Sequence, residues 1–370
     1  MRLFAKVVGV TAVAALALTG CGRGSDSGGS SGGSTGGSGS GFPADAVIGV
    51  SLPQKTSENW VLAESLFNDQ LKQAGFKGDV QFANGGVSEQ QNQIQATITK
   101  QAKVIVIGAI DGSQLGTQLK AAKDSGAIVV AYDRLLLNSP NVDYYIAYDN
   151  RKVGQLQGQA LLDGMKAKKP NGPYNIELFA GSPDDANAKV FFDGAMDILK
   201  PKIDDGTLKV VSGQKDFNQV VTQGWKAENA QKRMDTLLSA NYTSTELDGV
   251  LSPNDTLARA IITSCKAGGK PIPIVTGQDS EVESVKSIMA GEQYSTINKD
   301  TRNLVGDTVK MVQALQQGQQ PPPGINDTKS YNNGVKVVPA QLLPPVIVTK
   351  ANAKEAYAND PTLSKIVAGG

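Results

Sequence analysis

Polar side chains follow apolar, strand-like segments at several places in the sequence. They are Asp111 after 104–110, Asp133 and Arg134 after 128–132, Asn254 and Asp255 after 247–252, Gln278 and Asp279 after 274–276, and Lys299 after 294–297. Asp and Asn in front of a helix often serve as N-caps, worth about 1 kcal/mol each, so any one of them has a structural explanation. Arg134 and Lys299 cannot serve as N-caps, because their side chains carry donors and no acceptor. Carboxylates, amides and cations grouped in this way can donate to and accept from pairs of adjacent hydroxyl groups.

The two tryptophans of the chain fall near the same positions. Trp60 follows the apolar segment 46–52, and Trp225 begins a helical stretch. Packing in the core is the alternative for both rings, and it is less favoured for Trp225, whose neighbours Gly224 and Lys226 are small or polar. An indole ring offers a broad apolar face to the C–H face of a pyranose, so the pair predicts an aromatic wall for a sugar ligand.

The composition removes several classes of chemistry. The chain contains no histidine, so it can form neither a Ser-His-Asp or Cys-His nucleophile system nor a His-ligated metal site. Its cysteines are Cys21 and Cys265, which leaves one for the globular part, and no metal ion or cofactor is expected. Carboxylate pairs remain, so hydrolysis of the glycosidase type stays open on composition alone. The formal net charge of +1 gives no electrostatic basis for a nucleic-acid partner.

The first residues have the pattern of a secretory signal. A basic stretch, 1–6, precedes the uncharged and mostly apolar segment 7–18, which is shorter than the roughly 20 residues that a spanning helix needs. Residues 18–21, Leu-Thr-Gly-Cys, resemble the lipobox of bacterial lipoproteins, in which cleavage leaves the cysteine first and a diacylglyceryl group is attached to its thiol. We therefore expect Cys21 to be lipidated, with a free or disulfide-bonded cysteine as the alternative. Cys265 is expected to be a small buried apolar residue.

Residues 22–41 are almost entirely Gly and Ser and offer no apolar surface to bury. A Gly-rich coil of about 20 residues has a root-mean-square span of roughly 25 Å. The segment is therefore expected to be a tether that holds a folded body beside a membrane.

From residue 46 onward, apolar segments alternate with amphipathic helical stretches. The expected strands are 46–52, 79–83, 103–109, 127–132, 144–148, 174–180, 208–211, 247–252, 272–276 and 294–297, with helical stretches between most of them and a last one at 304–317. Segments 104–107 and 128–131 are apolar on both faces, as parallel strands covered by helices on each side must be. The pattern predicts an α/β fold of two doubly wound parallel-sheet lobes that are joined by a hinge of several crossings.

We divide the chain on this basis. Residues 1–20 are expected to be a lipoprotein signal peptide and 21–44 the lipidated cysteine with its tether. Residues 45–148 with about 300–330 form the N-terminal lobe, and 149–299 with about 331–370 form the C-terminal lobe. Ligands of open parallel sheets lie beyond the carboxyl ends of the strands, which places the polar groups described above in the cleft between the lobes.

Motifs along the body carry a resemblance to a known family. They are residues 109–112 (Ala-Ile-Asp-Gly), 131–135 (Ala-Tyr-Asp-Arg-Leu), 142–145 (Val-Asp-Tyr-Tyr) with 149–150 (Asp-Asn), 181–185 (Gly-Ser-Pro-Asp-Asp), 251–255 (Leu-Ser-Pro-Asn-Asp), 277–279 (Gly-Gln-Asp) and 333–339 (Asn-Gly-Val-Lys-Val-Val-Pro). From residue 48 to about 349, the chain resembles the xylose-binding and multiple-monosaccharide-binding periplasmic proteins of bacterial ATP-driven importers. The resemblance implies the type I periplasmic-binding fold.

The resemblance also implies a set of sugar contacts. They come from Trp60, Asp111, Asp133 and Arg134 in the first lobe, from Asn187, Trp225, Asn254 and Asp279 in the second, and from Lys299 at the hinge. Asn59, which we include among the contacts, stands where family members often carry an arginine. An asparagine amide is neutral and cannot make the charge-assisted hydrogen bonds that an arginine donates. This difference affects which sugar is bound and how tightly.

The sequence thus predicts an extracytoplasmic lipoprotein that binds an aldose of the xylose, glucose, galactose or arabinose type. It is expected to deliver the sugar by hinge closure to the permease subunits of an ABC importer, to be a monomer and not an enzyme, and to be held at the outer face of the cell membrane by its lipid anchor alone. A receptor that acts mainly in signalling or chemotaxis through a sensor partner is the alternative. A sugar-responsive repressor would need a basic helix-turn-helix where this chain has its signal and tether. A carboxylate-pair hydrolase would reveal itself by product formation.

Overall fold

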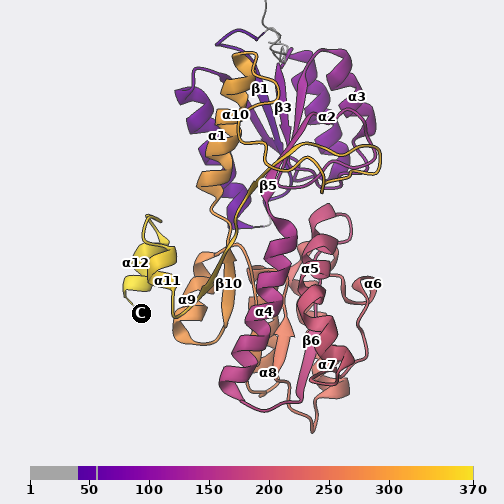
Figure 1. Ribbon diagram of the computed structural model, residues 1–370, viewed down its shortest axis with the longest axis vertical. Coiled ribbons are helices and arrows are strands. Elements are labelled where there is room, and N and C mark those ends of the chain that lie inside the picture. The colour runs from indigo at the N-terminus through magenta and orange to yellow at the C-terminus, as the bar shows by residue number, and fades with distance from the viewer. Residues whose placement is uncertain (1–40, 56, 370) are drawn as a thin grey trace, which may run out of the picture. The chain divides into compact units, whose positions relative to one another are not determined.

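The computed structural model describes residues 41–55 and 57–369, which fall within one compact unit, Ser38–Gly370. The predicted signal peptide, Cys21 and nearly all of the predicted tether lie outside the described residues. Figure 1 shows two α/β lobes, each built on its own parallel sheet, within this unit.

The first lobe is a six-stranded sheet with helices on both faces. Its elements in chain order are β1 (Val47–Leu52), α1 (Glu58–Gln73), β2 (Lys77–Phe82), α2 (Val87–Thr99), β3 (Val104–Ile107), α3 (Gly116–Asp124), β4 (Ile128–Tyr132) and β5 (Tyr144–Tyr148), joined later by α10 (Thr301–Gln316) and β11 (Ala340–Leu343). The strand order is β11-β5-β4-β3-β1-β2, and every pair is parallel. Alternate residues of β3 face opposite layers: Val104 and Val106 pack toward α1 and α10, and Ile105 and Ile107 toward α2 and α3. This two-sided burial explains the unbroken apolar runs.

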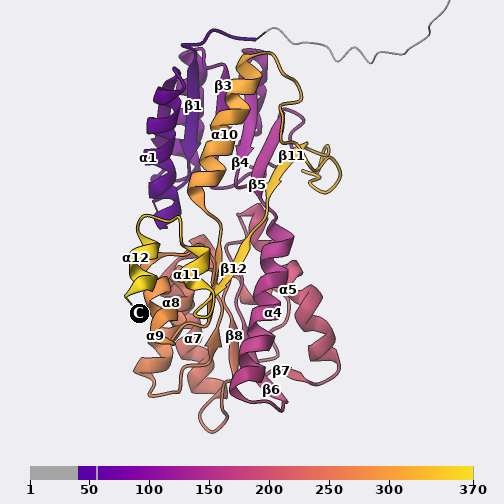
Figure 2. The same ribbon diagram turned by 60° about the vertical axis from the view of Figure 1, so that its left-hand side comes forward.

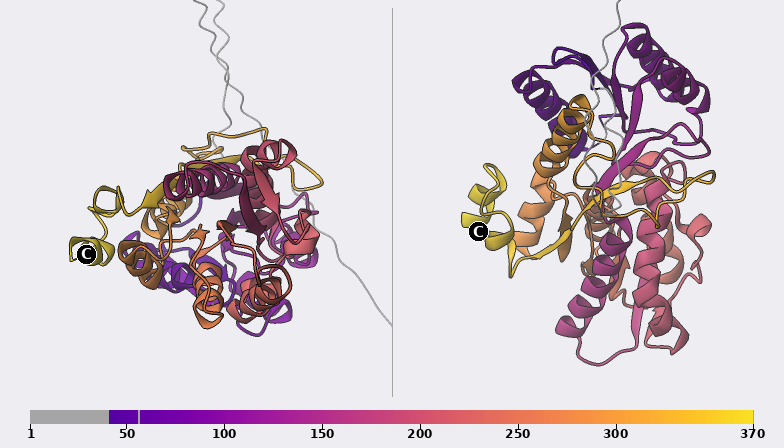
Figure 3. Two further views of the ribbon diagram at one scale, coloured as in Figure 1. Left: turned by 90° about the horizontal axis from the view of Figure 1, so that it is seen from below. Right: turned by 45° about the horizontal axis from the view of Figure 1, so that its top comes forward.

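The second lobe repeats the architecture on a smaller sheet. Its elements are α4 (Asn150–Lys168), β6 (Tyr174–Leu178), α5 (Ala186–Asp204), β7 (Leu208–Val210), α6 (Phe217–Val220), a 3-10 turn (Gln223–Trp225), α7 (Ala227–Asn241), β8 (Gly249–Leu251), α8 (Asp255–Ala267), β9 (Ile274–Val275) and α9 (Val282–Ala290). The parallel strand order is β7-β6-β8-β9. Helices α4 and α5 lie side by side, as Figure 3 shows, and pack with β6 in one core cluster, while α7 and α8 form the other.

The chain passes between the lobes at three places: from β5 to α4, from β10 (Ser295–Asn298) to α10, and from β11 to β12 (Val346–Thr349). The last of these crossings is visible as the continuous run of β11 and β12 in Figure 2. The helices α11 (Ala353–Ala356) and α12 (Leu363–Ala368) then pack on α9. Several crossings that lie together make a hinge, as the alternation of elements predicts.

The structure corrects three expectations. Residues 340–343 belong to the first lobe, because β11 pairs with β5 at the open edge of its sheet, whereas we expected all of 331–370 in the second. Strand β10 stands outside the four-stranded sheet and pairs antiparallel with β12. Trp225 does not begin a helix: it and Gly224 have φ of 54° and 66°, so α7 starts only at Ala227. None of the helices in the described ranges combines the length and the hydropathy of a membrane-spanning segment.

Candidate functional site

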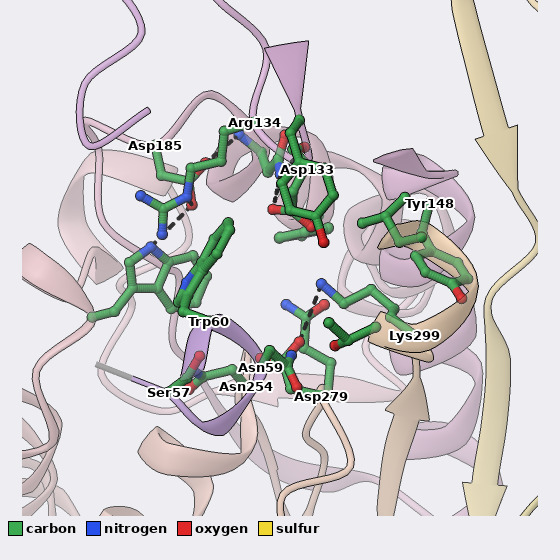
Figure 4. Close-up of a pocket in the computed structure, with 17 residues that line it drawn as sticks. Ser57, Asn59, Trp60, Asp133, Arg134, Tyr148, Asp185, Asn254, Asp279 and Lys299 are labelled. Atoms are coloured by element: carbon green, nitrogen blue, oxygen red, sulfur yellow. Dashed lines mark hydrogen bonds and ion pairs between the residues drawn. The ribbon is translucent and has the colours of Figure 1, made fainter. Parts of the chain in front are cut away.

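A cavity lies between the two lobes at the carboxyl ends of their strands (Figure 4). Its lining is Ser57, Asn59, Trp60, Tyr132, Asp133, Arg134, Tyr148, Asp185, Asn187, Phe191, Trp225, Asn254, Gln278, Asp279, Lys299, Thr301 and Leu304. Nine of the ten ligand contacts predicted from the sequence are among these residues, and Asp111 is not. The cavity is the place where open parallel sheets bind ligands.

Trp60 forms part of the first-lobe wall. It lies in the first turn of α1, next to Asn59, and its side chain is 8% exposed. One edge of the indole packs against Tyr132 at 6.1 Å between ring centroids and 62° between planes, and the guanidinium of Arg134 lies 5.4 Å from the ring centroid. The ring is therefore both a core residue and a cavity wall, so the two interpretations of Trp60 hold together.

Asp133 follows β4 with a left-handed backbone, at φ 60°. Its carbonyl oxygen accepts hydrogen bonds from Tyr145 Oη at 2.7 Å and Asn187 Nδ2 at 2.9 Å. Burial, together with nearby Asp185 and Asp279, raises the pKa of the Asp133 carboxyl above its usual 3.8, although Lys299 and Arg134 oppose the shift. Asp133 is thus a half-buried carboxyl in the cavity wall whose ionised form has no ion-pair partner within 4 Å among the described residues.

Arg134 reaches across the cavity wall. Its Nη1 donates to Ala109 O at 3.0 Å, and its Nε lies 3.0 Å from Asp185 Oδ2 in the second lobe. The same Oδ2 accepts a hydrogen bond from Trp225 Nε1 at 3.1 Å. The Asp185 carboxylate therefore contacts both the Arg134 guanidinium of the first lobe and the Trp225 indole of the second lobe.

Asn187 lies in the first turn of α5 and also bridges the lobes. Its Nδ2 donates to the Asp133 carbonyl, and its Oδ1 accepts from Asn150 Nδ2 at 2.9 Å. Each of these bonds occupies one of the amide's polar atoms. The arrangement ties the start of α5 to the crossing between β5 and α4.

Lys299 and Asp279 form an ion pair at the hinge side of the cavity. Lys299 Nζ lies 3.1 Å from Asp279 Oδ1 and 5.4 Å from the Phe191 ring centroid. Burial disfavours the charged amine, but the carboxylates of Asp279 and Asp133 outweigh it and raise the pKa of Lys299 above its usual 10.5. Lys299 is therefore a protonated donor at the cavity wall across the physiological range.

Asn254 and Asp255 have different places although they are adjacent. Asn254 lines the cavity and also caps α8, because its Oδ1 accepts from Leu257 N at 3.0 Å. Asp255 points into the second lobe, where it accepts from Glu281 N at 3.0 Å, Thr296 Oγ1 at 2.9 Å and Gln293 Nε2 at 2.8 Å. The cap role and the cavity position thus coincide at Asn254.

Asp111 lies outside the cavity and bonds to its own loop. Its carboxylate accepts from Ser113 N at 2.9 Å, Ser113 Oγ at 2.6 Å and Gln114 Nε2 at 2.5 Å. An aspartate followed at two residues by serine is a common turn pattern, and this local signal favours the structural role.

Eight lining residues were not among the predicted contacts: Ser57, Tyr132, Tyr148, Asp185, Phe191, Gln278, Thr301 and Leu304. Gln278 has the same strand-end position as Asp279, and Asp185 stands at the N-cap of α5 within the 181–185 motif, so both carry a sequence signal. Tyr148 and Thr301 flank hinge crossings, and their approach depends on how the lobes meet.

The cavity as a whole is polar, with paired charges and two indoles. Two ion pairs, Arg134 with Asp185 and Lys299 with Asp279, place donors and acceptors side by side. Within 41–55 and 57–369, no group of three or more Cys, Asp or Glu side chains is arranged to hold a metal ion. The arrangement suits a neutral ligand that carries several hydroxyl groups and an apolar face.

Comparisons with known proteins agree on one family. The profile described as a periplasmic binding protein domain matches residues 48–320. The chain is 51% identical to the multiple sugar-binding periplasmic receptor of Rhizobium radiobacter over 84% of this chain and 89% of that protein. It is 37% identical to the D-xylose-binding periplasmic protein of Escherichia coli over 85% of this chain and 89% of the relative.

A solved structure gives the same result in three dimensions. An ABC transporter solute-binding protein from Clostridium phytofermentans with bound β-D-glucose superimposes with a TM-score of 0.81 and 42% identity, covering 85% of this chain and 98% of that one. The two lobes, their hinge crossings and the cavity between them have the arrangement of the type I periplasmic-binding fold. The chain therefore belongs to the multiple-sugar periplasmic binding protein family.

Proposed function

We propose that this chain captures a neutral aldose between its two lobes and presents the closed form to the permease subunits of an ABC importer. The observation that carries the proposal is the cavity itself, because both lobes contribute hydrogen-bonding side chains and one tryptophan each to a single polar slot. The names of its relatives, which include sugar-binding and D-xylose-binding proteins, support an aldose of the xylose, glucose, galactose or arabinose type.

Closure is the step that these contacts favour. Arg134 pairs with Asp185, and Asn187 bonds to Asp133, each across the cleft. A third contact joins Glu58 Oε2 to Val282 N at 2.9 Å. A ligand that bridges the lobes stabilises the closed arrangement, because the contacts to the far lobe are lost on opening.

Each type of side chain has a separate task in this proposal. The carboxylates of Asp133 and Asp279 accept hydrogen bonds from sugar hydroxyls, and Lys299 and Arg134 donate to hydroxyl or ring oxygens. The Asn59 and Asn254 amides offer further donors and acceptors, and Trp60 and Trp225 cover the apolar face of the ring. Asp111 was expected to join them, and its place outside the cavity argues against direct contact.

Titration calorimetry with xylose, glucose, galactose, arabinose and ribose tests the proposal. Receptors of this kind bind in the micromolar range or tighter, at about −8 kcal/mol or better. Both tryptophans of the chain line the cavity, so a bound sugar should also change the intrinsic fluorescence. Absence of heat and of any fluorescence change across the panel would discard the sugar assignment. The bound sugar should be recovered unchanged after prolonged incubation, which separates a receptor from a hydrolase.

We further propose that Cys21 is the site of lipid attachment and that the anchor holds a monomer at the extracytoplasmic face of the cell membrane. Stable anchoring needs more than one acyl chain, which the lipoprotein modification supplies. The Cys21→Ser variant should leave the membrane fraction and bind sugar with unchanged affinity. A variant that stays with the membrane would contradict the anchor.

A further inference from the structure

Gly181 lies directly beneath the indole of Trp225. A Cβ atom at position 181 would lie 2.1 Å from Cη2 and Cζ2 of Trp225 and 2.8 Å from its Cε2. These are atoms of a rigid ring, so the ring as a whole would have to move. Gly181 has no left-handed φ, so its need for glycine comes from this close approach and not from its backbone conformation.

The ring is held in this position from several sides. Its Nε1 donates to Asp185 Oδ2 at 3.1 Å, and the backbone N of Trp225 donates to Thr222 O at 3.1 Å. The loop that carries it is bound to the chain around Gly181 through Gly224 N to Ser182 Oγ at 2.7 Å and Thr222 N to Gly181 O at 3.2 Å. A displaced indole would lose its bond to Asp185, which is also the partner of Arg134.

The first lobe has a milder version of the same arrangement. Gly108 comes directly after β3, and a Cβ there would lie 3.2 Å from Cζ3 and 3.4 Å from Cη2 of Trp60. A contact at this distance can be relieved by a shift of a few tenths of an ångström. Each tryptophan of the cavity therefore lies against a glycine that follows a strand, and the second-lobe pair allows far less adjustment.

We propose that Gly181 is a positioning residue for ligand binding: it lets the Trp225 indole lie flat on the backbone, where it forms the second-lobe face of the slot. The inference rests on the proposed function, because it gives Trp225 a contact with the sugar. An alanine at 181 pushes the ring from its place and weakens binding, whereas an alanine at 108 has a small effect. The loss of sugar affinity comes from the displaced Trp225 ring, so it disappears when a smaller ring stands at position 225.

A double-mutant cycle tests this. Sugar affinity is measured by calorimetry for the wild type, Gly181→Ala, Trp225→Phe and the double variant, with the tightest binder of the aldose panel as the probe. We expect Gly181→Ala to weaken binding about tenfold, as the loss of one aromatic contact does, and to change affinity less than about twofold in the Trp225→Phe background. Equal losses in both backgrounds, or wild-type affinity for Gly181→Ala, would overturn the proposal.

Two further measurements distinguish displacement of the Trp225 ring from a general disturbance of the fold. Gly116, exposed at the start of α3, has open space around its missing Cβ, so Gly116→Ala should bind as the wild type. In a Trp60→Phe background Trp225 is the sole tryptophan, and Gly181→Ala should shift its emission. Unchanged emission would contradict a displaced ring.

If Gly181→Ala does not fold, the double variant decides. The double variant should fold and bind sugar as Trp225→Phe does, and an equally unfolded double variant would refute the inference. Wild-type affinity for Trp225→Phe and Trp225→Ala would instead refute the contact between Trp225 and the sugar.

Discussion

The Nε atom of Arg134, in the first lobe, lies 3.0 Å from Oδ2 of Asp185, the N-cap residue of α5 in the second. The two side chains are 13% and 4% exposed, so this ion pair is formed largely away from water. The same carboxylate holds the Trp225 indole. One acidic residue, which is absent from the predicted contacts, therefore links the lobes at the wall of the cavity.

Replacement of Asp185 by asparagine should weaken sugar binding by about tenfold to a hundredfold. The amide removes the charge opposite Arg134, and a buried cation that loses its partner is costly in the closed form, whereas opening of the cleft returns it to water. Calorimetry gives the affinity, and solution scattering gives the fraction that closes at saturating sugar. Asp184→Asn is the matched control, because Asp184 is adjacent and its carboxylate accepts from Gln223 Nε2 in its own lobe, at 3.5 Å. Equal affinities for the two variants would contradict a role for the cross-lobe pair.

Glu58 provides a smaller contribution to closure. Its Oε2 accepts a hydrogen bond from Val282 N at the start of α9, whose own N-cap residue, Glu281, makes no side-chain cap. Glu58 thus caps a helix of the opposite lobe, and a cap is worth about 0.5–2 kcal/mol. We expect Glu58→Ala to weaken binding about twofold to tenfold, mainly through faster sugar release in stopped-flow fluorescence.

The control for this change is Glu64→Ala. Glu64 lies on the same helix and pairs with Lys55 inside the first lobe, at 3.3 Å. Its loss should leave sugar release unchanged. A release rate for Glu58→Ala equal to that of the wild type would show that the contact does not stabilise the closed form.

Sugar affinity should fall as the pH is lowered from neutral toward 3.8. The folded-state pKa of Asp133 is raised above 3.8, chiefly by burial, so this carboxylate becomes protonated at a higher pH than an exposed one. A protonated carboxyl accepts fewer hydrogen bonds from the ligand. Calorimetry across this pH range measures the effect, and Asp133→Asn should bind more weakly and with a flatter pH profile. Asparagine tolerates the left-handed φ of 60° at this position.

The same variant makes a prediction about stability. Because the folded pKa of Asp133 lies above the unfolded one, the ionised form costs folding free energy above that pKa, and the cost is relieved as the pH falls through it. Asp133→Asn should therefore unfold at neutral pH with a free energy equal to or higher than that of the wild type. A variant that is less stable at neutral pH and keeps the wild-type pH profile of binding would contradict both statements.

Asp279→Asn should make the free energy of sugar binding less favourable by about 1.5–3 kcal/mol, the range of a lost hydrogen bond to a charged group. The change removes the partner of Lys299, which is held at 3.1 Å, and one acceptor for sugar hydroxyls. Asparagine is preferred to alanine in this test, because the φ of 97° at position 279 strains most side chains. The control is Asp193→Asn. Asp193 pairs with Lys189 one turn earlier on the exposed side of α5, and this variant should bind sugar as the wild type does. Unchanged affinity for Asp279→Asn would remove this residue from the site.

Cys265 should be unreactive in the native protein. Its side chain is 0% exposed, and burial raises the pKa of its thiol to about 11. In a Cys21→Ser background it is the sole thiol of the chain, so a chromogenic thiol reagent reports on it alone. The reagent should react only after addition of denaturant. Rapid reaction in native buffer would show that the core around α8 opens readily.

Much of this molecule was predictable because local patterns and the rules of parallel sheets act together. Apolar runs such as 104–107 can be covered on both faces only in a sheet between helices, and the carboxyl ends of such strands converge at one edge. This reasoning predicts that Asp133, Asn254 and Lys299 lie near one another, and all three line the cavity. Asp111 does not line it, since a strand-end position does not show whether a side chain turns into the cleft or back to its own loop.

The sequence by itself determined the alternation of strands and helices from β1 to α10, the two-lobe α/β class, the strand-end positions of several cavity residues and the absence of histidine chemistry. These follow from hydrophobic period and from residue type, which are local properties. Only the tertiary structure decided that β11 completes the first sheet, that Asp185 joins Arg134 to Trp225, and that Gly181 makes room for an indole. Those relationships depend on which segments pack together in the folded chain, within a lobe or between the lobes, and residues far apart in the chain carry no local pattern that shows it.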